Sequence, residues 1–247
     1  GDGKETVYIA TDGNGVHFLS HKDRKVVRRF FHDVNDKEGI RSNSIYSLLV
    51  DDRGAVWVGH FQAGLDYSLY QNGLFRTYAY LPQFNSANLS IRSFVNRGPE
   101  KVIGSRDGLF YINEATGIVK SFVKPVLTSD LILTICFYEG EYYIGTYGGG
   151  MMVLNPQTLS LKYFTQGDTE LFQKGHIFCV KPDNRGNLWI GTSQGLFCYN
   201  GQTKQIKNFT STNSQLPEGN VYEVSFDSTG KGWIATETGM CIYDPAS

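Results

Sequence analysis

The chain has 247 residues, and its 23 basic and 24 acidic side chains leave a formal net charge of −1. Because this balance provides no basic field and no apolar run is long enough to cross a membrane, we expect neither nucleic acid nor a membrane as a partner of this segment. The 28 glycines, 15 tyrosines and 16 phenylalanines favour short strands joined by tight turns. We therefore expect an all-β fold with little helix.

One strand pattern, which ends in a small residue, recurs six times along the chain. Its copies are 41 to 49 residues apart, a spacing typical of propeller repeats. In three copies an Asp lies six residues, and a Gly three residues, before a Trp. These positions predict a hairpin turn, because Asp accepts backbone N–H groups and Gly adopts positive φ. The small residues are Ala10, Gly59, Gly104, Gly145, Gly191 and Ala235, and the three turns begin at Asp51, Asp183 and Asp227.

Each copy resolves into four expected strands. An inner strand follows a polar residue, the strand with the small residue comes second, and a third strand follows a Gly. The fourth strand carries a basic residue two positions before an aromatic one, and such edge charges block pairing between sheets. Four strands per repeat favour an antiparallel propeller blade. The inner strands are expected at 43–50, 88–95, 130–137, 176–180 and 220–226, and the basic residues are Arg28, Arg76, Lys120, Lys162 and Lys207.

We predict a single β-propeller domain over residues 1–247, with about five to six four-stranded blades. The first copy has no inner strand and the last has no fourth strand, and a ring of seven such repeats needs about 315 residues. This count favours an arc or fragment of a larger propeller sensor, with an irregular six-bladed ring as the alternative. The blades are expected at approximately 1–35, 43–80, 88–124, 130–166, 175–210 and 219–247, the first and last incomplete.

Two segments resemble a known repeat family. Residues 43–60 and 183–200 are similar to the two-component regulator propeller repeat. The resemblance implies the periplasmic sensor region of a hybrid two-component system, an inner-membrane protein that joins a histidine kinase, a receiver and a DNA-binding module and often responds to oligosaccharides. It implies that this segment senses a ligand, that the kinase domain lies elsewhere in the parent protein, and it allows a homodimer of the full-length sensor. Three copies depart from the pattern, with Tyr8, Val102 and Tyr143 in place of Trp.

The sequence predicts no catalytic residue, no cofactor and no metal. Residues 191–195 fit the G-x-S-x-G nucleophile elbow, but that motif needs a helix after the serine, and a strand is expected here. The five histidines have no metal-ligand spacing. The tryptophans are expected to be core anchors. Four cysteines lie in apolar strands, which favours buried free thiols, while their even number in an oxidising compartment permits disulfides: Cys136, Cys179, Cys198 and Cys241.

We expect a ligand where the loop before each inner strand and the turn between the second and third strands open on one face. Amides, an arginine and aromatic side chains there suit a small molecule, namely a neutral or weakly acidic oligosaccharide. The alternatives are a protein-interaction or dimerisation module and, less favoured because few acidic groups converge, a propeller lyase or hydrolase. The candidate binding residues are Asn43, His60, Phe61, Gln62, Asn88, Arg106, Asp107, Tyr147, His176, Gln194, Asn220 and Glu237.

Overall fold

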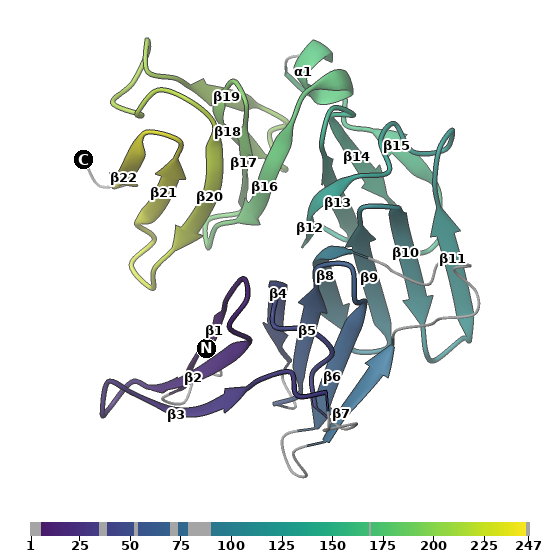
Figure 1. The fold of residues 1–247 in the computed structure, drawn as a ribbon. Coiled ribbons are helices and arrows are strands. Elements are labelled where there is room, and N and C mark those ends of the chain that lie inside the picture. The colour runs from purple at the N-terminus through teal and green to yellow at the C-terminus, as the bar shows by residue number, and fades with distance from the viewer. Residues whose placement is uncertain are drawn as a thin grey trace. The chain divides into compact units, whose positions relative to one another are not determined.

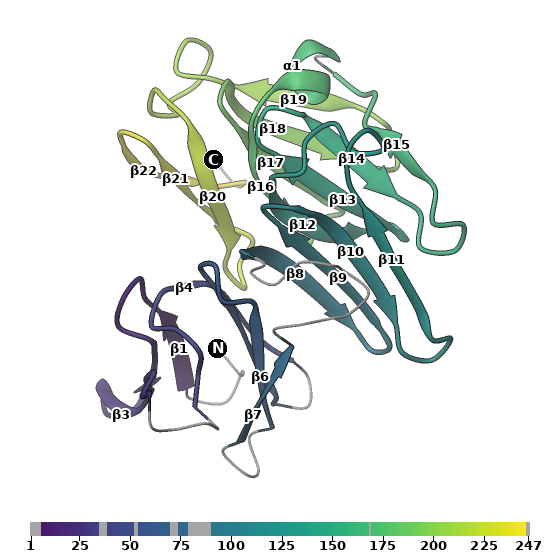
Figure 2. The same cartoon turned by 45° about the vertical axis from the view of Figure 1, so that its right-hand side comes forward.

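The structure is a computed structural model that describes residues 6–34, 39–51, 54–69, 74–78, 90–167 and 169–245 (Figure 1). The described residues form six antiparallel sheets and one short helix, α1 (Thr169–Lys174). The chain divides into two compact units, residues 1–121 and 122–247. Within each sheet the strands lie side by side in chain order, as they do in a propeller blade (Figure 2).

The N-terminal unit holds three sheets. The first consists of β1 (Thr6–Ala10), β2 (Val16–Ser20) and β3 (Lys25–Phe30). The second consists of β4 (Ile45–Val50), β5 (Val56–His60), β6 (Leu65–Leu69) and β7 (Leu74–Tyr78). The third consists of β8 (Ile91–Arg97), β9 (Glu100–Ser105), β10 (Gly108–Asn113) and β11 (Ile118–Phe122), which ends at the border of the two units. Two clusters of buried apolar side chains join successive sheets of this unit.

The C-terminal unit holds the other three sheets. The first consists of β12 (Ile132–Tyr138), β13 (Glu141–Thr146), β14 (Met151–Leu154) and β15 (Leu161–Tyr163). The second consists of β16 (Ile177–Pro182), β17 (Asn187–Thr192), β18 (Gly195–Asn200) and β19 (Ile206–Phe209). The third consists of β20 (Val221–Phe226), β21 (Gly232–Thr236) and β22 (Gly239–Tyr243). Here too, buried apolar clusters join each sheet to the next.

The expected all-β class and the expected strands are confirmed. Each inner strand begins one or two residues after its polar residue where that residue is described, and each small residue of the repeat lies in or at the end of a second strand. The fourth strands β3, β7, β11 and β15 lie at sheet edges, as does β19. That the six sheets form a single domain stays a prediction.

The Asp of the repeated turn holds the tryptophan of the same copy. Oδ2 of Asp51 accepts the indole N–H of Trp57 at 3.1 Å, and Oδ1 accepts the backbone N–H of Ala55 at 2.8 Å. One carboxylate therefore closes the hairpin and orients a large ring toward the next sheet. This double role explains why Asp and Trp lie six residues apart.

In three of the second strands the small residue, Gly59, Gly145 or Gly191, lies where successive sheets approach closely. A Cβ atom at Gly145 would lie 2.6 Å from Cγ2 of Thr134 and 2.7 Å from Cγ2 of Ile177, the first residue of β16. At Gly191, a Cβ atom would lie 2.6 Å from the carbonyl oxygen of Val221, the first residue of β20. Neither position has room for a methyl group, so glycine is required for this packing between sheets.

The sequence analysis does not predict α1, which lies in the loop before β16. Its residues Leu171 and Phe172 are fully buried in the cluster between the first two sheets of the C-terminal unit. The backbone N–H of Gly150 donates to the carbonyl of Gly175 at 2.9 Å, and both ribbon views show α1 beside β14 (Figures 1 and 2). Six residues are too few to establish a helical hydrophobic period, so packing rather than pattern specifies this helix.

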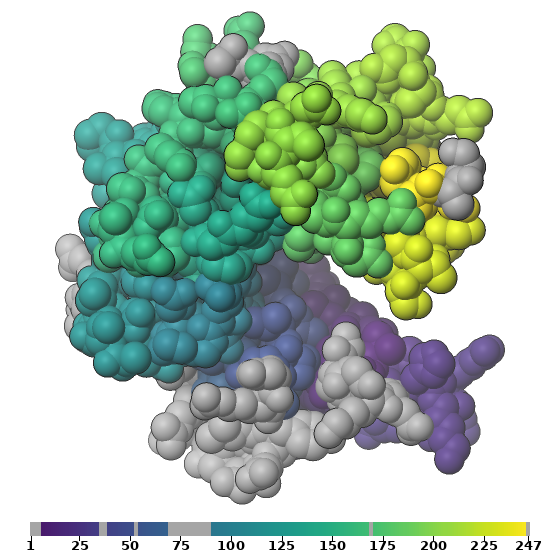
Figure 3. Space-filling model, turned by 180° about the vertical axis from the view of Figure 1, so that it is seen from behind, coloured from purple at the N-terminus to yellow at the C-terminus, as the bar shows by residue number. Residues whose placement is uncertain are grey.

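The expectation that all three tryptophans anchor the core is wrong for Trp233. Trp57 and Trp189 are 6% and 2% exposed, whereas Trp233 is 42% exposed. The two buried rings pack against the inner strand of the following sheet, at Phe94 and Phe226 respectively. Within the described residues no sheet follows β20–β22, whose last strands are visible in yellow in Figure 3. The position in the repeat alone therefore does not bury a tryptophan, since the two buried rings also contact a following inner strand.

Candidate functional site

One hydrogen bond joins the two expected loops at the same end of five sheets. The first residue of the turn between the second and third strands donates its backbone N–H to the carbonyl of the residue just before the inner strand. The two loops of a blade therefore open on one face, as predicted, and we call this end of each sheet the rim. The donor and acceptor pairs are Phe61 and Ser44, Arg106 and Ser90, Tyr147 and Leu131, Ser193 and His176, and Glu237 and Asn220, at 2.9 to 3.2 Å.

A hydroxyl group closes the rim turn in five of the six sheets. The last residue of the second strand, or the residue directly after it in the first sheet, donates its side-chain O–H to the carbonyl of a glycine. This glycine opens the third strand or lies just before it. These hydroxyls belong to Thr11, Ser105, Thr146, Thr192 and Thr236. In the sheet β4–β7, the corresponding residue is His60. Its replacement of a hydroxyl makes this rim chemically different from the others.

Every described inner strand also carries a β-bulge at its second residue. The pairing with the second strand skips one residue at this point in all five inner strands. A bulge leaves its extra residue outside the regular pairing and redirects the side chain. None of the bulge residues is buried, and the sequence analysis misses them as site residues. They are Tyr46, Arg92, Leu133, Phe178 and Tyr222.

In the N-terminal unit, His60 is a structural residue. Its Nε2 lies 2.8 Å from Oδ2 of Asp66, and both side chains are fully buried. Oδ2 of Asp66 also accepts the backbone N–H of Arg41 at 2.8 Å, which ties down the loop before β4. His60 was predicted to bind a ligand, but its ring has no exposed surface from which to do so.

Asn43 also serves the fold of this unit. Its Oδ1 accepts the backbone N–H of His32 at 2.7 Å, and its carbonyl accepts the backbone N–H groups of Gly13 and Gly15. These bonds join the first sheet to the loop before β4. The amide oxygen that sequence reasoning assigned to a ligand is thus engaged by the backbone.

The remaining candidates of the N-terminal unit lie at its rim. The ring of Phe61 contacts that of the bulge residue Tyr46, with centroids 5.0 Å apart, and the guanidinium of Arg92 lies 5.1 Å from the Tyr46 centroid. Gln62, Arg106 and Asp107 are exposed. Asn88 lies outside the described residues.

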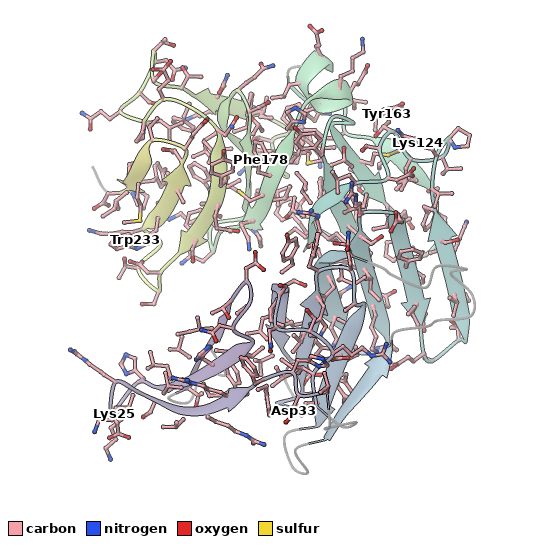
Figure 4. The ribbon with its side chains drawn as sticks, in the orientation of Figure 1. Lys25, Asp33, Lys124, Tyr163, Phe178 and Trp233 are labelled. Carbon is pink, nitrogen blue, oxygen red and sulfur yellow. The ribbon has the colours of Figure 1, made fainter. Side chains whose placement is uncertain are left out.

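In the C-terminal unit, four rings form a continuous row across the rims of three sheets. Tyr147 stacks on His176, with centroids 4.0 Å apart and planes inclined by 25°. The ring of Phe178 lies 6.2 Å from His176 and meets Tyr222 edge to face at 5.1 Å. Figure 4 marks Phe178 on β16, the middle inner strand of this row. We call Tyr147, His176, Phe178 and Tyr222 the aromatic row.

Polar candidates lie at one end of the aromatic row. Nδ2 of Asn220 donates to the hydroxyl of Tyr222 at 3.2 Å, and Oε2 of Glu237 accepts the backbone N–H of Asn220 at 3.3 Å. Gln194 is exposed at the rim of β16–β19. The structure thus brings Tyr147, His176, Asn220 and Glu237 to one continuous surface of the C-terminal unit and adds Phe178 and Tyr222 to them.

The rim groups suit binding rather than bond cleavage. Ser193 lies in the turn between β17 and β18, so a strand follows it instead of the helix that a nucleophile elbow needs. No cluster of His, Cys, Asp or Glu in the described ranges is arranged to hold a metal ion. Aromatic faces and amides can make apolar contacts and hydrogen bonds to a ligand.

Comparison with protein families decides the repeat type. Residues 39–62 and 172–194 match the family model described as "Two component regulator propeller". Two of the six copies thus match the two-component regulator propeller repeat. Each match covers the loop before an inner strand, that strand, the second strand and the rim turn, so these repeats include the rim described above. Comparison with curated proteins gives no match.

Solved structures with the same fold include two from Bacteroides. The extracellular domain of BT3049 of B. thetaiotaomicron, assigned to a hybrid two-component system, is 23% identical, with a TM-score of 0.71 over 98% of this chain and 34% of that chain. The extracellular domain of BT4673 of B. thetaiotaomicron, also assigned to a hybrid two-component system, is 19% identical, with a TM-score of 0.70 over 97% of this chain and 32% of that chain.

A third similar structure comes from a different system. PorZ, an essential surface component of the type-IX secretion system of Porphyromonas gingivalis, is 16% identical, with a TM-score of 0.76 over 97% of this chain and 37% of that chain. The present chain spans about a third of the length of these three chains. The similarities confirm the β-propeller fold of the repeats.

Proposed function

We propose that this chain is the extracytoplasmic, ligand-sensing segment of a hybrid two-component sensor and that it responds to oligosaccharides. The observation that carries the proposal is the pair of two-component regulator propeller repeats, at residues 39–62 and 172–194. The similarity to two extracellular domains assigned to hybrid two-component systems supports it. Because a fold alone does not define a function, the rim chemistry has to supply the ligand.

In this proposal the segment binds a signal, and the histidine kinase lies in another part of the parent protein. No helix in the described ranges is both long and apolar enough to cross a membrane. We place the segment in the periplasm, as part of an inner-membrane protein whose full-length form dimerises. The segment itself performs no catalysis and takes no cofactor.

The rims support an oligosaccharide as the ligand. Partly exposed rings in the aromatic row offer apolar faces to the C–H groups of a sugar, and the exposed side chains of Gln194 and Glu237 offer partners to its hydroxyls. Exposed Arg106 provides a cation at another rim. Loops on a rigid β scaffold are a common location for such sites.

The test is the thermal unfolding midpoint of the chain with and without a panel of oligosaccharides. A ligand that binds only the native state stabilises it by about 2.7 kcal/mol at a concentration of about 100 times Kd. We expect a reproducible increase for one sugar class that is reduced in Arg106→Ala or His176→Ala. Cooperative unfolding with no shift for any sugar in the panel would contradict the proposal.

A protein-interaction or dimerisation module is the second candidate, and exposed apolar side chains favour it. Met240 and Ile242 on β22 are more than half exposed, and Trp233 on the neighbouring strand β21 is also exposed. Apolar side chains gathered on one sheet are typical of an interaction surface. If the chain self-associates through this surface, the double change Met240→Glu and Ile242→Glu should yield monomers in light scattering, whereas ligand binding at the rims should be unchanged.

A further inference from the structure

Two rings of the aromatic row lie at the β-bulge that recurs in the inner strands. Phe178 and Tyr222 are bulge residues of β16 and β20, so neither follows the regular alternation of its strand. In the other described inner strands this position holds Tyr46, Arg92 and Leu133. Only in the C-terminal unit do two successive described bulges both present aromatic rings, and those rings contact each other.

The row offers ring surface that the fold itself does not cover. Tyr147 is 50% exposed and Tyr222 is 44% exposed, although both belong to a rim fixed by backbone hydrogen bonds. Between them, His176 and Phe178 are partly buried and link the two tyrosines. The row is therefore a continuous strip with an accessible ring at each end.

His176 adds an unsatisfied polar atom to the strip. Its Nδ1 is buried and has no hydrogen-bond partner among the described residues. The atom lies close to the rim turn, since a Cβ atom at Gly148 would be 3.9 Å from it. Because Nδ1 is buried beneath the row, a ligand does not reach it, and the polar groups next to the row's exposed end are those of Asn220 and Glu237.

Charge at these rims discriminates between ligand classes. The rim segments of the C-terminal unit are residues 130–131, 147–150, 175–176, 193–194, 219–220 and 237–238. Their charged residues are Asp130 and Glu237, both acidic, and they include no Lys or Arg. The longer loops before the inner strands add two lysines, Lys124 and Lys174, and two glutamates, Glu170 and Glu218, so the loops stay acidic in sum. Such a surface disfavours an anionic ligand, because bringing like charges together raises the free energy of binding.

We propose that the aromatic row of the C-terminal unit is a binding site for an uncharged oligosaccharide. The inference rests on the proposed function and narrows its ligand from oligosaccharides in general to neutral ones. Sugar rings lie with their C–H faces on the exposed faces of Tyr147 and Tyr222. Their hydroxyls bond to Asn220 and Glu237.

The experiment is calorimetric titration of the 247-residue chain with neutral and anionic oligosaccharides of equal length. The neutral probes are maltohexaose, cellohexaose, xylohexaose and mannohexaose, and the anionic probe is hexagalacturonate. The variants are Tyr147→Ala and Tyr222→Ala. The matched control is Tyr163→Ala, because Tyr163 is 46% exposed in the same unit but lies on the edge strand β15 (Figure 4).

We expect at least one neutral probe to bind and its Kd to rise about tenfold in Tyr147→Ala and in Tyr222→Ala, with Tyr163→Ala within about twofold of the wild type. Tyr222→Phe should retain most of the affinity, because it keeps the ring. Binding that survives both alanine changes would overturn the role of the row and leave the sensing proposal intact. Tighter binding of hexagalacturonate than of every neutral probe would overturn the inference of a neutral ligand. No binding of any probe would overturn both proposals.

Discussion

The indole N–H of Trp189 donates a hydrogen bond to Oδ2 of Asp183 at 2.9 Å. Oδ1 of the same carboxylate accepts the backbone N–H groups of Arg185 and Asn187, each at 2.8 Å. Burial acts to raise the pKa of Asp183, but the hydrogen bonds from Asn187, Trp189 and the backbone outweigh burial and hold the pKa below its ordinary value. The folded turn therefore favours the ionised carboxylate.

Asp183→Asn should lower the free energy of unfolding near pH 7 by about 1 to 3 kcal/mol, because charge-assisted hydrogen bonds are replaced by weaker ones. The folded-state pKa lies below the unfolded value of about 3.9, so the stability that the carboxylate contributes is present above that value. It is lost as the pH falls through the folded pKa. Urea unfolding should therefore show a steeper loss below about pH 4 for the wild type than for Asp183→Asn.

Asp107→Asn is the control for this measurement, because Asp107 is an exposed aspartate at a rim turn. Its unfolding curve should follow that of the wild type at each pH. Identical pH dependence of the wild type and Asp183→Asn would mean that the turn does not favour the ionised form.

The buried pair His60 and Asp66 should show strong energetic coupling. His60→Thr introduces the residue found at the same rim position in four other sheets, but it removes a buried partner of the Asp66 carboxylate. Each single change, His60→Thr or Asp66→Phe, should cost about 3 to 5 kcal/mol. The double variant should cost clearly less than the sum of the two. A double-mutant cycle by chemical unfolding measures this coupling, and additive costs would contradict it.

The four cysteines, which are free thiols in the structure, should react slowly with thiol reagents in the native protein. Burial raises the pKa of Cys136 to about 11 and that of Cys179 to about 12, so little thiolate forms near pH 8. Burial raises the pKa of Cys198 to about 11 as well, so accessibility decides the order. Time-resolved alkylation with mass spectrometry should find Cys136 and Cys179 slower than Cys198 and Cys241, which are only half-buried. Labelling of Cys179 as fast as in denaturant would contradict this burial.

Trp233 should dominate the quenching of tryptophan fluorescence. It is 42% exposed, whereas Trp57 and Trp189 are buried. Acrylamide should therefore quench the wild type more efficiently than Trp233→Phe, whose remaining rings are both shielded. Trp57→Phe is the matched variant and should leave a strongly quenchable signal. Equal quenching of the two variants would show that Trp233 is covered.

Much of the fold could be predicted from the sequence because the repeat fixes its own register. The acidic turn, the tryptophan and the small residue form local contacts at constant spacing, so six second strands are evident without any tertiary information. The helix α1 escapes prediction, because its six residues carry no helical period. The exposure of Trp233 depends on whether another sheet packs against it, and the residues around it, 232–235, do not specify such packing.

The site could be predicted only in part. Spacing placed Tyr147, His176 and Asn220 at the rims, because these loops have fixed positions in the repeat. The spacing could not identify Phe178 and Tyr222, because in the sequence they resemble ordinary residues of an inner strand. Only the structure shows that a bulge removes them from the regular pairing. Likewise, the burial of His60 depends on Asp66, six residues later. In most of the other copies the residue equivalent to Asp66 is apolar.

The most direct test of the account is a crystal structure of the chain grown with the neutral oligosaccharide that binds it most tightly. The account predicts that sugar rings lie on the exposed faces of Tyr147 and Tyr222, with a hydroxyl within hydrogen-bond distance of Asn220 or of Glu237. Sugar bound only at the rims of the N-terminal unit or along the edge strands would contradict the assignment of this site.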